Sequence, residues 1–179
     1  MFVGRKEELA DLMTLWRKRT SSIVACRGRR RIGKSTLFRE FARRSADVYI
    51  EIEGLAPQLE NSPAVQDQLD HFIEVLSGLT GCDSSKVDNW FAAFSRLEKQ
   101  IDDAKKTVIL LDEISWMAGD DANFPGKFAS SPAIHEISSS KITVFFASSI
   151  CSSKRLNAAN QLSTFDESHP VSPESTSMK

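Results

Sequence analysis

The sequence predicts an α/β fold in which helices cover both faces of a parallel sheet. Three observations lead to this prediction. Short segments that are apolar along their whole length alternate with segments of amphipathic helical periodicity. A glycine-containing loop joins the first apolar segment to a helical one, and a later apolar segment ends in two adjacent carboxylates. With 179 residues, of which 41% are hydrophobic, the chain has the size of one domain.

The first half of the chain predicts helix, strand, helix and strand in that order. Residues 7–19 form an amphipathic helix, because apolar side chains recur at helical spacing at Leu9, Leu12, Met13 and Trp16. Residues 23–26 read Ile-Val-Ala-Cys, which suits a short buried strand. A second helical pattern covers residues 34–43, and a second strand covers residues 49–52.

The second half predicts two helical stripes and two further strands. The stripes lie between residues 63 and 103, and the glycine-containing segment 78–83 separates them. Residues 108–111 and 142–147 are continuous apolar runs, which are typical of strands buried on both faces. We expect a core over residues 1–153 and a disordered Ser/Pro-rich tail over residues 154–179.

Composition excludes several classes of protein. The formal net charge of -1 argues against a generally polycationic nucleic-acid binder. The longest apolar runs have four residues, whereas a membrane span needs about 20. Because the N-terminus also lacks a secretory signal, we expect a cytoplasmic protein without a membrane partner. Three widely spaced cysteines predict neither a disulfide framework nor a zinc site.

The most informative segment, residues 28–35, reads GRRRIGKS and fits the phosphate-binding P-loop pattern G-x-x-x-x-G-K-[ST]. An apolar strand precedes it and an amphipathic helix follows it, as this motif requires. Glycines allow backbone N–H groups to close around phosphate oxygens. The residues expected to contact the nucleotide from this segment are Gly28, Arg29, Arg30, Arg31, Ile32, Gly33, Lys34, Ser35 and Thr36.

Three side chains of this segment have distinct expected roles. Lys34 reaches the β- and γ-phosphates, the Ser35 hydroxyl binds Mg²⁺, and Thr36 lies near the α-phosphate. The positive end of the helix that begins here points at the anion. The alternative is a glycine-rich basic turn without a ligand.

A second motif, residues 108–113, is an apolar strand that ends in Asp112 and Glu113, the Walker B pattern. A parallel strand delivers both carboxylates to the sheet edge at which α/β proteins bind ligands. We expect Asp112 to hold Mg²⁺ and Glu113 to act as general base for the attacking water. Small GTPases lack this glutamate and carry an Asn-Lys-x-Asp tetrapeptide, which does not occur here. The pair therefore indicates an additional-strand ATPase that uses a catalytic glutamate.

Two further features leave alternatives open. Ser149 follows the strand over residues 142–147, where such ATPases place a polar residue that contacts the γ-phosphate or the water; it is equally a turn serine. The arginines of residues 27–31 attract the polyphosphate, contact a neighbour or nucleic acid, or form a solvated turn face.

These motifs resemble those of a known family. Residues 2–9, FVGRKEEL, resemble the F-V-G-R-x-x-E-L opening of AAA+ ATPases of the archaeal-type and STAND-like branches, and the Cdc6/Orc initiators begin similarly. GRRRIGKS resembles the GRRRxGK[ST] loop of archaeal-type ATPases, and residues 110–117 and 123–127 resemble that family's Walker B strand and the segment after it. The match covers residues 1–127, with looser similarity up to residue 153.

The resemblance implies an AAA+-like P-loop NTPase fold that binds ATP and Mg²⁺ and hydrolyses ATP. It places Phe2, Val3 and Gly4 near the adenine and Arg5 at the same edge of the site. The family's strand after Walker B usually ends in Cys-Gly-Ser, whereas here Ser148 replaces the glycine and Ser149 keeps the sensor position. Arg155 is a weak candidate for an arginine finger.

Family members continue into a helical or winged-helix lid, which this sequence does not show, so we expect a truncated N-terminal ATPase core. The expected function is Mg²⁺-dependent ATP binding with slow hydrolysis. The alternatives are a nucleotide-gated signalling or DNA-associated switch, and a remnant that binds nucleotide but hydrolyses little. A P-loop kinase is disfavoured, because no acceptor-site signature is present. Besides ATP, the expected partners are a second copy, a missing C-terminal lid or effector domain, or DNA.

Overall fold

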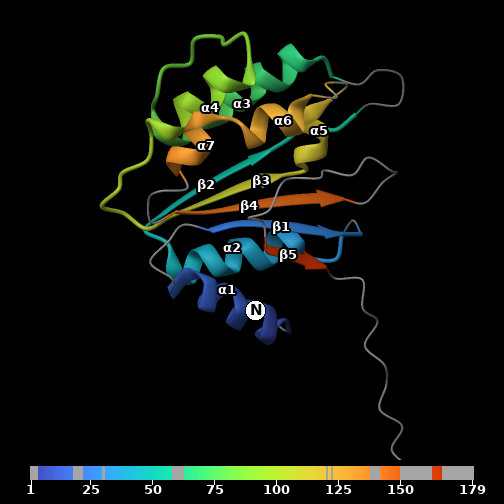
Figure 1. The fold of residues 1–179 in the computed structure, drawn as a ribbon, viewed down its shortest axis with the longest axis vertical. Coiled ribbons are helices and arrows are strands. Elements are labelled where there is room, and N and C mark those ends of the chain that lie inside the picture. Colours follow the sequence, from blue (N-terminus) through green and yellow to red (C-terminus); the bar gives the residue numbers. More distant parts are fainter. Residues whose placement is uncertain are drawn as a thin grey trace, which may run out of the picture.

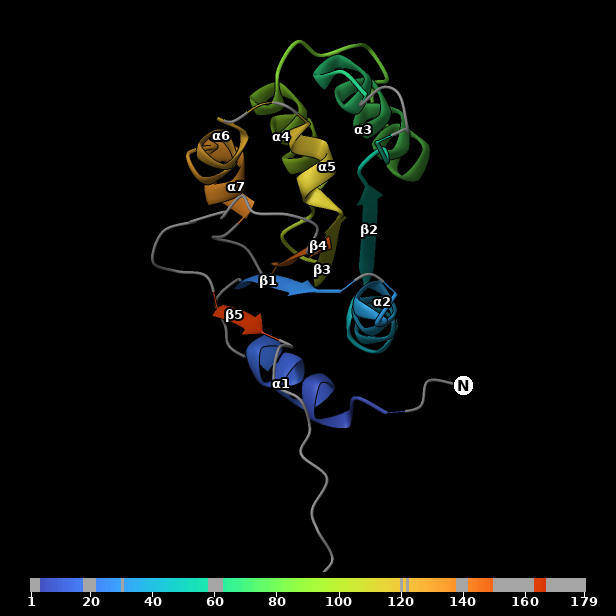
Figure 2. The same cartoon turned by 90° about the vertical axis from the view of Figure 1, so that its right-hand side faces the viewer.

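The structure, a computed structural model, describes residues 4–17, 22–29, 31–57, 63–119, 121, 123–137, 142–149 and 163–166. Its centre is a five-stranded sheet in the order β2-β3-β4-β1-β5, in which every neighbouring pair is parallel. Helices cover both faces of this sheet, as Figures 1 and 2 show from two directions. The predicted α/β layering is therefore confirmed.

All four predicted strands form, each one or more residues longer than expected, and a fifth joins them. The strands are β1 (Ser22–Gly28), β2 (Val48–Glu53), β3 (Thr107–Asp112), β4 (Ile142–Ser149) and β5 (Ser163–Asp166). The sequence does not predict β5, because its four residues are too few to show an apolar period. It pairs with β1 inside the segment assigned to the tail. The rest of residues 154–179 lies outside the described residues, so the tail remains a prediction.

In the part of the chain that the structure describes, two helices cover one face of the sheet. They are α1 (Lys6–Arg17) and α2 (Lys34–Ser45), which lie below the strands in Figure 1. Their buried apolar side chains pack against alternate residues of β1 and β3, and this core contains Leu9, Leu12, Val24, Leu37, Phe38, Phe41, Val108 and Leu110. Both helices begin and end within two residues of their predicted bounds.

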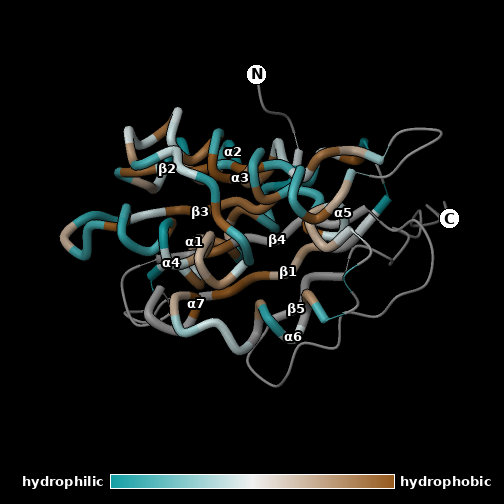
Figure 3. The backbone as a smooth tube through the Cα atoms, turned by 90° about the horizontal axis from the view of Figure 1, so that it is seen from above, coloured by the Kyte–Doolittle hydropathy of each residue, from teal (hydrophilic) through white to brown (hydrophobic). Residues whose placement is uncertain are grey.

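Within the described residues, five helices cover the opposite face. They are α3 (Val65–Thr80), α4 (Trp90–Glu98), α5 (Ile114–Ala118), α6 (Phe124–Ala129) and α7 (Pro132–Ile137). An aromatic cluster joins three of them, with Trp90 and Phe124 edge to face at a centroid distance of 5.0 Å. Figure 3 shows hydrophobic residues along β1 and β3, whereas the connecting loops are largely hydrophilic. The three short helices were not predicted, because five or six residues cannot show helical periodicity.

The predicted break at residues 78–83 begins too early. Helix α3 continues through Gly78 to Thr80 and ends at Gly81, which has a φ of 74°. A left-handed residue that closes the last turn is the position where glycine is favoured. Gly78 is tolerated inside the helix at a cost of about 1 kcal/mol.

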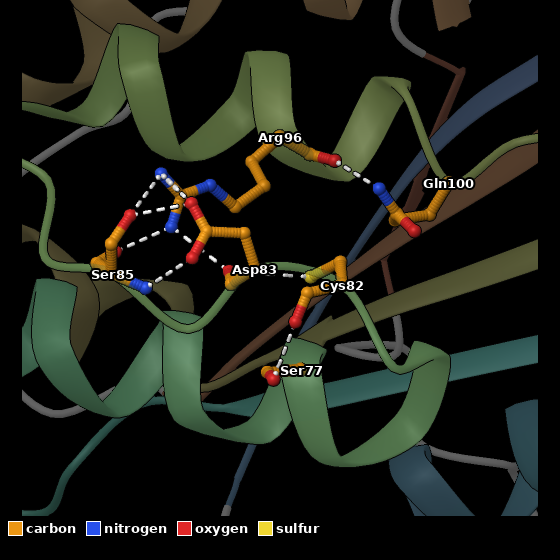
Figure 4. Close-up of polar contacts among 6 residues, drawn as sticks. All are labelled: Ser77, Cys82, Asp83, Ser85, Arg96 and Gln100. Atoms are coloured by element: carbon orange, nitrogen blue, oxygen red, sulfur yellow. Dashed lines mark hydrogen bonds and ion pairs between the residues drawn. The ribbon is translucent and has the colours of Figure 1, made fainter.

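The connection between α3 and α4, which we name the strap (residues 81–89), runs back along α3 (Figure 4). At one end Ser77 donates a hydrogen bond to the Cys82 carbonyl (2.7 Å), and at the other Gln66 donates to the Val87 carbonyl (3.1 Å). From α4, Arg96 donates to the carbonyls of Asp83 and Ser85. Helix α4 therefore begins beside the start of α3.

Among the described residues, no helix combines the length and the apolar character that crossing a membrane requires.

Candidate functional site

The parallel strands bring the predicted residues to one edge of the sheet. In the register, Gly28 at the end of β1 lies opposite Ser149 at the end of β4, and Asp112 at the end of β3 lies opposite Glu53 at the end of β2. Strand β4 pairs with both β1 and β3. An additional strand thus separates the glycine loop from the carboxylates, as the Asp-Glu pair predicts.

The loop between β1 and α2 turns sharply at two left-handed residues. Arg31 has a φ of 62° and Gly33 a φ of 86°. A Cβ added at Gly33 would meet no atom within 4 Å, so the backbone conformation, rather than space, requires glycine there. Helix α2 begins directly after Gly33 and has no acidic residue in its first turn. Its first N–H groups and positive dipole end therefore remain suited to an anion.

Lys34 lies folded over this loop. Its side chain is 6% exposed, and its Nζ donates hydrogen bonds to the carbonyl oxygens of Gly28 (3.1 Å) and Arg29 (2.9 Å). These two hydrogen bonds tie the ammonium group to the loop between β1 and α2.

Ser35 and Asp112 meet although 77 residues separate them in the chain. The Ser35 Oγ donates to Asp112 Oδ2, and the Glu113 backbone N–H donates to Asp112 Oδ1 at 3.0 Å. Burial raises the pKa of the Asp112 carboxyl, and these two hydrogen bonds oppose that effect. A hydroxyl and a carboxylate at one point form a donor set of hard oxygens, which fits Mg²⁺.

Glu113 follows in the left-handed conformation, with a φ of 49° and a ψ of 46°. Such a backbone costs a residue other than glycine about 1–3 kcal/mol and is common at functional sites. Glu113 is 8% exposed. Its carbonyl accepts a hydrogen bond from the Trp116 N–H at 2.7 Å, and this bond closes the first turn of α5. The Glu113 side chain therefore starts from a turn at the sheet edge whose backbone is held by this hydrogen bond.

The N-terminal segment is attached to the same loop. Arg5, itself left-handed at a φ of 51°, donates from Nη2 to the Ile32 carbonyl at 2.6 Å. Gly4 immediately precedes this contact, and Val3 lies outside the described residues.

The remaining predicted residues are less closely gathered. Arg29, Arg31 and Thr36 are exposed and Ile32 is half-buried, whereas Arg30 is outside the described residues. The backbone of Ser149 lies in β4 opposite Gly28, but its side chain is also outside the described part.

Strand β2 contributes charged groups that the sequence analysis missed. Arg39 of α2 donates from Nε to both carboxylate oxygens of Glu51 (3.0 and 2.9 Å), and the Tyr49 hydroxyl donates to the same group at 2.8 Å. Burial raises the pKa of Glu53, and Asp112 and Glu113 raise it further. Tyr49, Glu51 and Glu53 alternate with buried isoleucines, and this period of two was the signal available in the sequence.

Comparison with known sequences gives two matches. A family model described as an ATPase domain predominantly from Archaea matches residues 2–166. An uncharacterized ATP-binding protein of Methanocaldococcus jannaschii is 44% identical over 41 residues, which are 23% of this chain and 70% of that protein.

Solved structures share the fold at low sequence identity. A Walker-type ATPase of Pyrococcus abyssi aligns with a TM-score of 0.55 and 15% identity over 83% of this chain and 45% of its own. Cdc6p from Pyrobaculum aerophilum aligns with a TM-score of 0.54 and 13% identity over 83% of this chain and 40% of its own. The ORC2 protein of Aeropyrum pernix aligns with a TM-score of 0.53 and 15% identity over 83% of this chain and 42% of its own. The chain spans less than half the length of each. These similarities confirm the predicted P-loop fold.

Proposed function

The chain belongs to the family of ATPase domains found predominantly in Archaea, and on this premise we propose that it binds ATP with Mg²⁺ and hydrolyses it slowly. The observation that carries the proposal is the contact between Ser35, in the first turn of α2, and Asp112, at the end of β3. This contact joins the phosphate loop to the carboxylate that a divalent cation needs. The match to a protein named as ATP-binding supports the choice of nucleotide.

Each part of the edge has a binding role in this proposal. The backbone of residues 28–33 and the N-terminus of α2 surround the phosphates, and Lys34 exchanges its two carbonyl partners for phosphate oxygens. Ser35 and Asp112 hold Mg²⁺, which offsets phosphate charge when bound. Thr36 lies on the α-phosphate side. From the family resemblance, Val3 and Gly4 lie beside the adenine.

Hydrolysis needs a base at the position of Glu113. In the proposed reaction its carboxylate takes a proton from a water as the water oxygen bonds to the γ-phosphorus. The bond from the γ-phosphorus to the bridging β–γ oxygen breaks, so ADP and phosphate are the products. Ser149 orients the water or the γ-phosphate from the end of β4.

The Lys34→Ala variant tests the binding half of the proposal. A lost charge-assisted contact costs about 1.5–3 kcal/mol, so the variant should bind Mg·ATP about 10- to 150-fold more weakly in titration calorimetry. Lys105→Ala, an exposed lysine outside the site, serves as the control and should bind like the wild type. Equal affinity in Lys34→Ala and a wild type that binds measurably would remove the P-loop assignment.

A nucleotide-gated switch that associates with DNA is a second candidate. The exposed side chains of Arg29 and Arg31 at the nucleotide loop favour it, because guanidinium groups pair with phosphates. The affinity for a duplex oligonucleotide, titrated at several salt concentrations, should fall as salt rises. In the Arg29→Ala/Arg31→Ala variant this dependence of affinity on salt should be less steep. Arg43→Ala/Arg44→Ala, on the far end of α2, is the control. Absence of DNA binding with and without ATP would exclude this candidate.

A further inference from the structure

The segment that leaves β2 packs directly against the turn that carries Glu113. We name Glu53, Gly54 and Leu55 the exit segment. The Gly54 N–H donates to the Asp112 carbonyl at 3.0 Å and so continues the pairing of β2 with β3 beyond the last strand residue. A Cβ added at Gly54 would lie 2.9 Å from the Glu113 carbonyl oxygen and 3.0 Å from the Met117 backbone nitrogen.

Space, rather than backbone conformation, requires glycine at this position. Gly54 is not among the residues with a positive φ, so alanine can adopt its backbone. The two nearest atoms are both main-chain atoms of the turn that begins α5, and distances near 3.0 Å are ones that a real Cβ hardly ever shows. A methyl group at position 54 therefore has to displace either the exit segment or residues 113–117.

Helix α3 prevents the exit segment from moving away. The buried side chain of Gln68 accepts from the Leu55 N–H (2.9 Å) and donates to the Leu55 carbonyl (3.0 Å), which satisfies both of its backbone groups. The His71 ring nitrogen Nε2 lies 3.1 Å from the Glu53 carbonyl oxygen. The exit segment is thus held between α3 and the turn.

We propose that Gly54 is a positioning residue for Glu113. Because the exit segment is braced by Gln68 and carries no side chain at position 54, it fixes the left-handed turn from which the Glu113 side chain starts. This inference rests on the proposed function, in which Glu113 is the base. It assigns no nucleotide contact to Gly54, so its effect belongs to kcat and not to affinity.

The Gly54→Ala variant tests this assignment. We expect kcat for ATP to fall about 10- to 100-fold, since a misplacement of about 1 Å at a reacting group costs that much. The Kd for a non-hydrolysable ATP analogue with Mg²⁺ should stay within about twofold of the wild type, because the P-loop is untouched. Gly78→Ala is the matched control: a Cβ there meets nothing within 4 Å, and both kcat and Kd should stay at wild-type values.

A second variant removes the brace without adding an atom at the turn. Gln68→Leu keeps the approximate size of the side chain but loses both hydrogen bonds to Leu55, so kcat should again fall while Kd is kept. If Gly54→Ala fails to fold, this variant decides the question by the same two measurements. Unchanged kcat in Gln68→Leu and in any folded Gly54→Ala overturns the inference. So does a loss of affinity as large as the loss of kcat.

Glu113→Gln separates failure of the inference from failure of the proposed function. If this variant keeps the wild-type turnover, Glu113 is not the base and the function proposed for the site fails. If it abolishes turnover while Gly54→Ala and Gln68→Leu keep theirs, only the positioning role is overturned.

Discussion

Asp112 is subject to two opposing influences. Burial favours its neutral form, whereas the Ser35 hydroxyl and the Glu113 N–H stabilise its charged form, and the balance leaves its pKa raised. Nearby Glu113 and Glu51 add to the rise. A divalent ion bound by this carboxylate would stabilise the charged form and so oppose the effect of burial.

This raised pKa has a definite consequence for stability. A carboxyl whose pKa is higher in the folded state stabilises the fold when protonated, and that contribution is lost as pH rises from its ordinary value through the folded pKa. Asp112→Asn removes the charge; its amide oxygen can still accept from the Glu113 N–H, and its NH2 group can donate to the Ser35 hydroxyl oxygen. The ligand-free variant should therefore gain stability over the wild type as pH rises from about 4 to 7, measured by thermal unfolding.

Asp70→Asn provides a control of opposite sign. Hydrogen bonds from Lys86 and Gln66 lower the pKa of Asp70, so its contribution is present above its ordinary pKa and lost on acidification. That variant should be the less stable one at neutral pH and equal to the wild type in acid. Identical pH profiles for Asp112→Asn and the wild type would contradict the reasoning about burial.

Glu113→Gln should preserve nucleotide binding and abolish turnover. Glutamine retains the shape of the side chain and an acceptor oxygen, but it cannot take a proton from water. We expect the affinity for Mg·ATP to change less than about threefold while hydrolysis falls at least about 100-fold, within the usual contribution of a general base. Titration calorimetry and phosphate release measure the two effects. Retained turnover would mean that the pair is structural.

At the scale of single residues, the sequence is most informative where a motif is local. Lys34, Ser35 and Asp112 belong to short patterns whose chemistry dictates residue type and spacing, and the structure brings them together. Gly54 carries no such signal, because its importance depends on Met117, a neighbour only in space. In the sequence, Glu51 shows only as an acidic residue that alternates with isoleucines, and its partner Arg39 lies on another element.

At the scale of elements, long periodic segments were predictable and short ones were not. Helices α1 to α4 and strands β1 to β4 each contain enough apolar residues to show a period of 3.6 residues or a continuous run. Helix α5 packs on α3 and β4, and α6 and α7 pack on α4, so tertiary contacts decide all three. Gly81, and not Gly78, ends α3, since only Gly81 takes the left-handed conformation.

Arg96 attaches the first half of the strap to α4. Arg96 donates to the carbonyls of Asp83 and Ser85 and to the Ser85 hydroxyl (Figure 4). Arg96→Leu should lower the free energy of unfolding by about 1–3 kcal/mol and speed hydrogen exchange over residues 81–89. Lys99→Leu, exposed at the end of the same helix, is the control. Nucleotide affinity should not change, because the strap lies outside the site; wild-type exchange in Arg96→Leu would contradict the assignment.

At the scale of the whole molecule, the Asp-Glu pair predicts the additional strand between β1 and β3, but the places of β2 and β5 are what sequence reasoning could not provide. The motifs predict that the glycine loop and the two carboxylates share one edge, and they do. The placement of β5 beside β1, and of β2 at the opposite edge of the sheet, depends on crossovers whose length and packing the motifs do not encode. Parallel sheets allow several such orders with the same local patterns.

The isolated chain should hydrolyse ATP well below about 10 s⁻¹, the median turnover of enzymes. Stabilising charge on the transferred phosphoryl group takes an arginine, worth about 10³–10⁵ in rate. Two nearby arginines of the described part are already engaged, Arg5 by the Ile32 carbonyl and Arg39 by Glu51. Phosphate release measured over a range of protein concentrations tests this. A monomer with ordinary enzyme rates would contradict it, and specific activity that rises with concentration would indicate help from a second copy.

The folded position of Lys34 has a consequence for the exchange of product for substrate. A buried ammonium group left without acceptors costs several kcal/mol, so departure of a nucleotide would ordinarily be opposed by the lysine it leaves behind. The carbonyl oxygens of Gly28 and Arg29 both accept from this ammonium group, so in the proposed exchange they are acceptors to which it can return. A site built this way suits a ligand that is repeatedly replaced, in contrast to one that is retained for the lifetime of the protein.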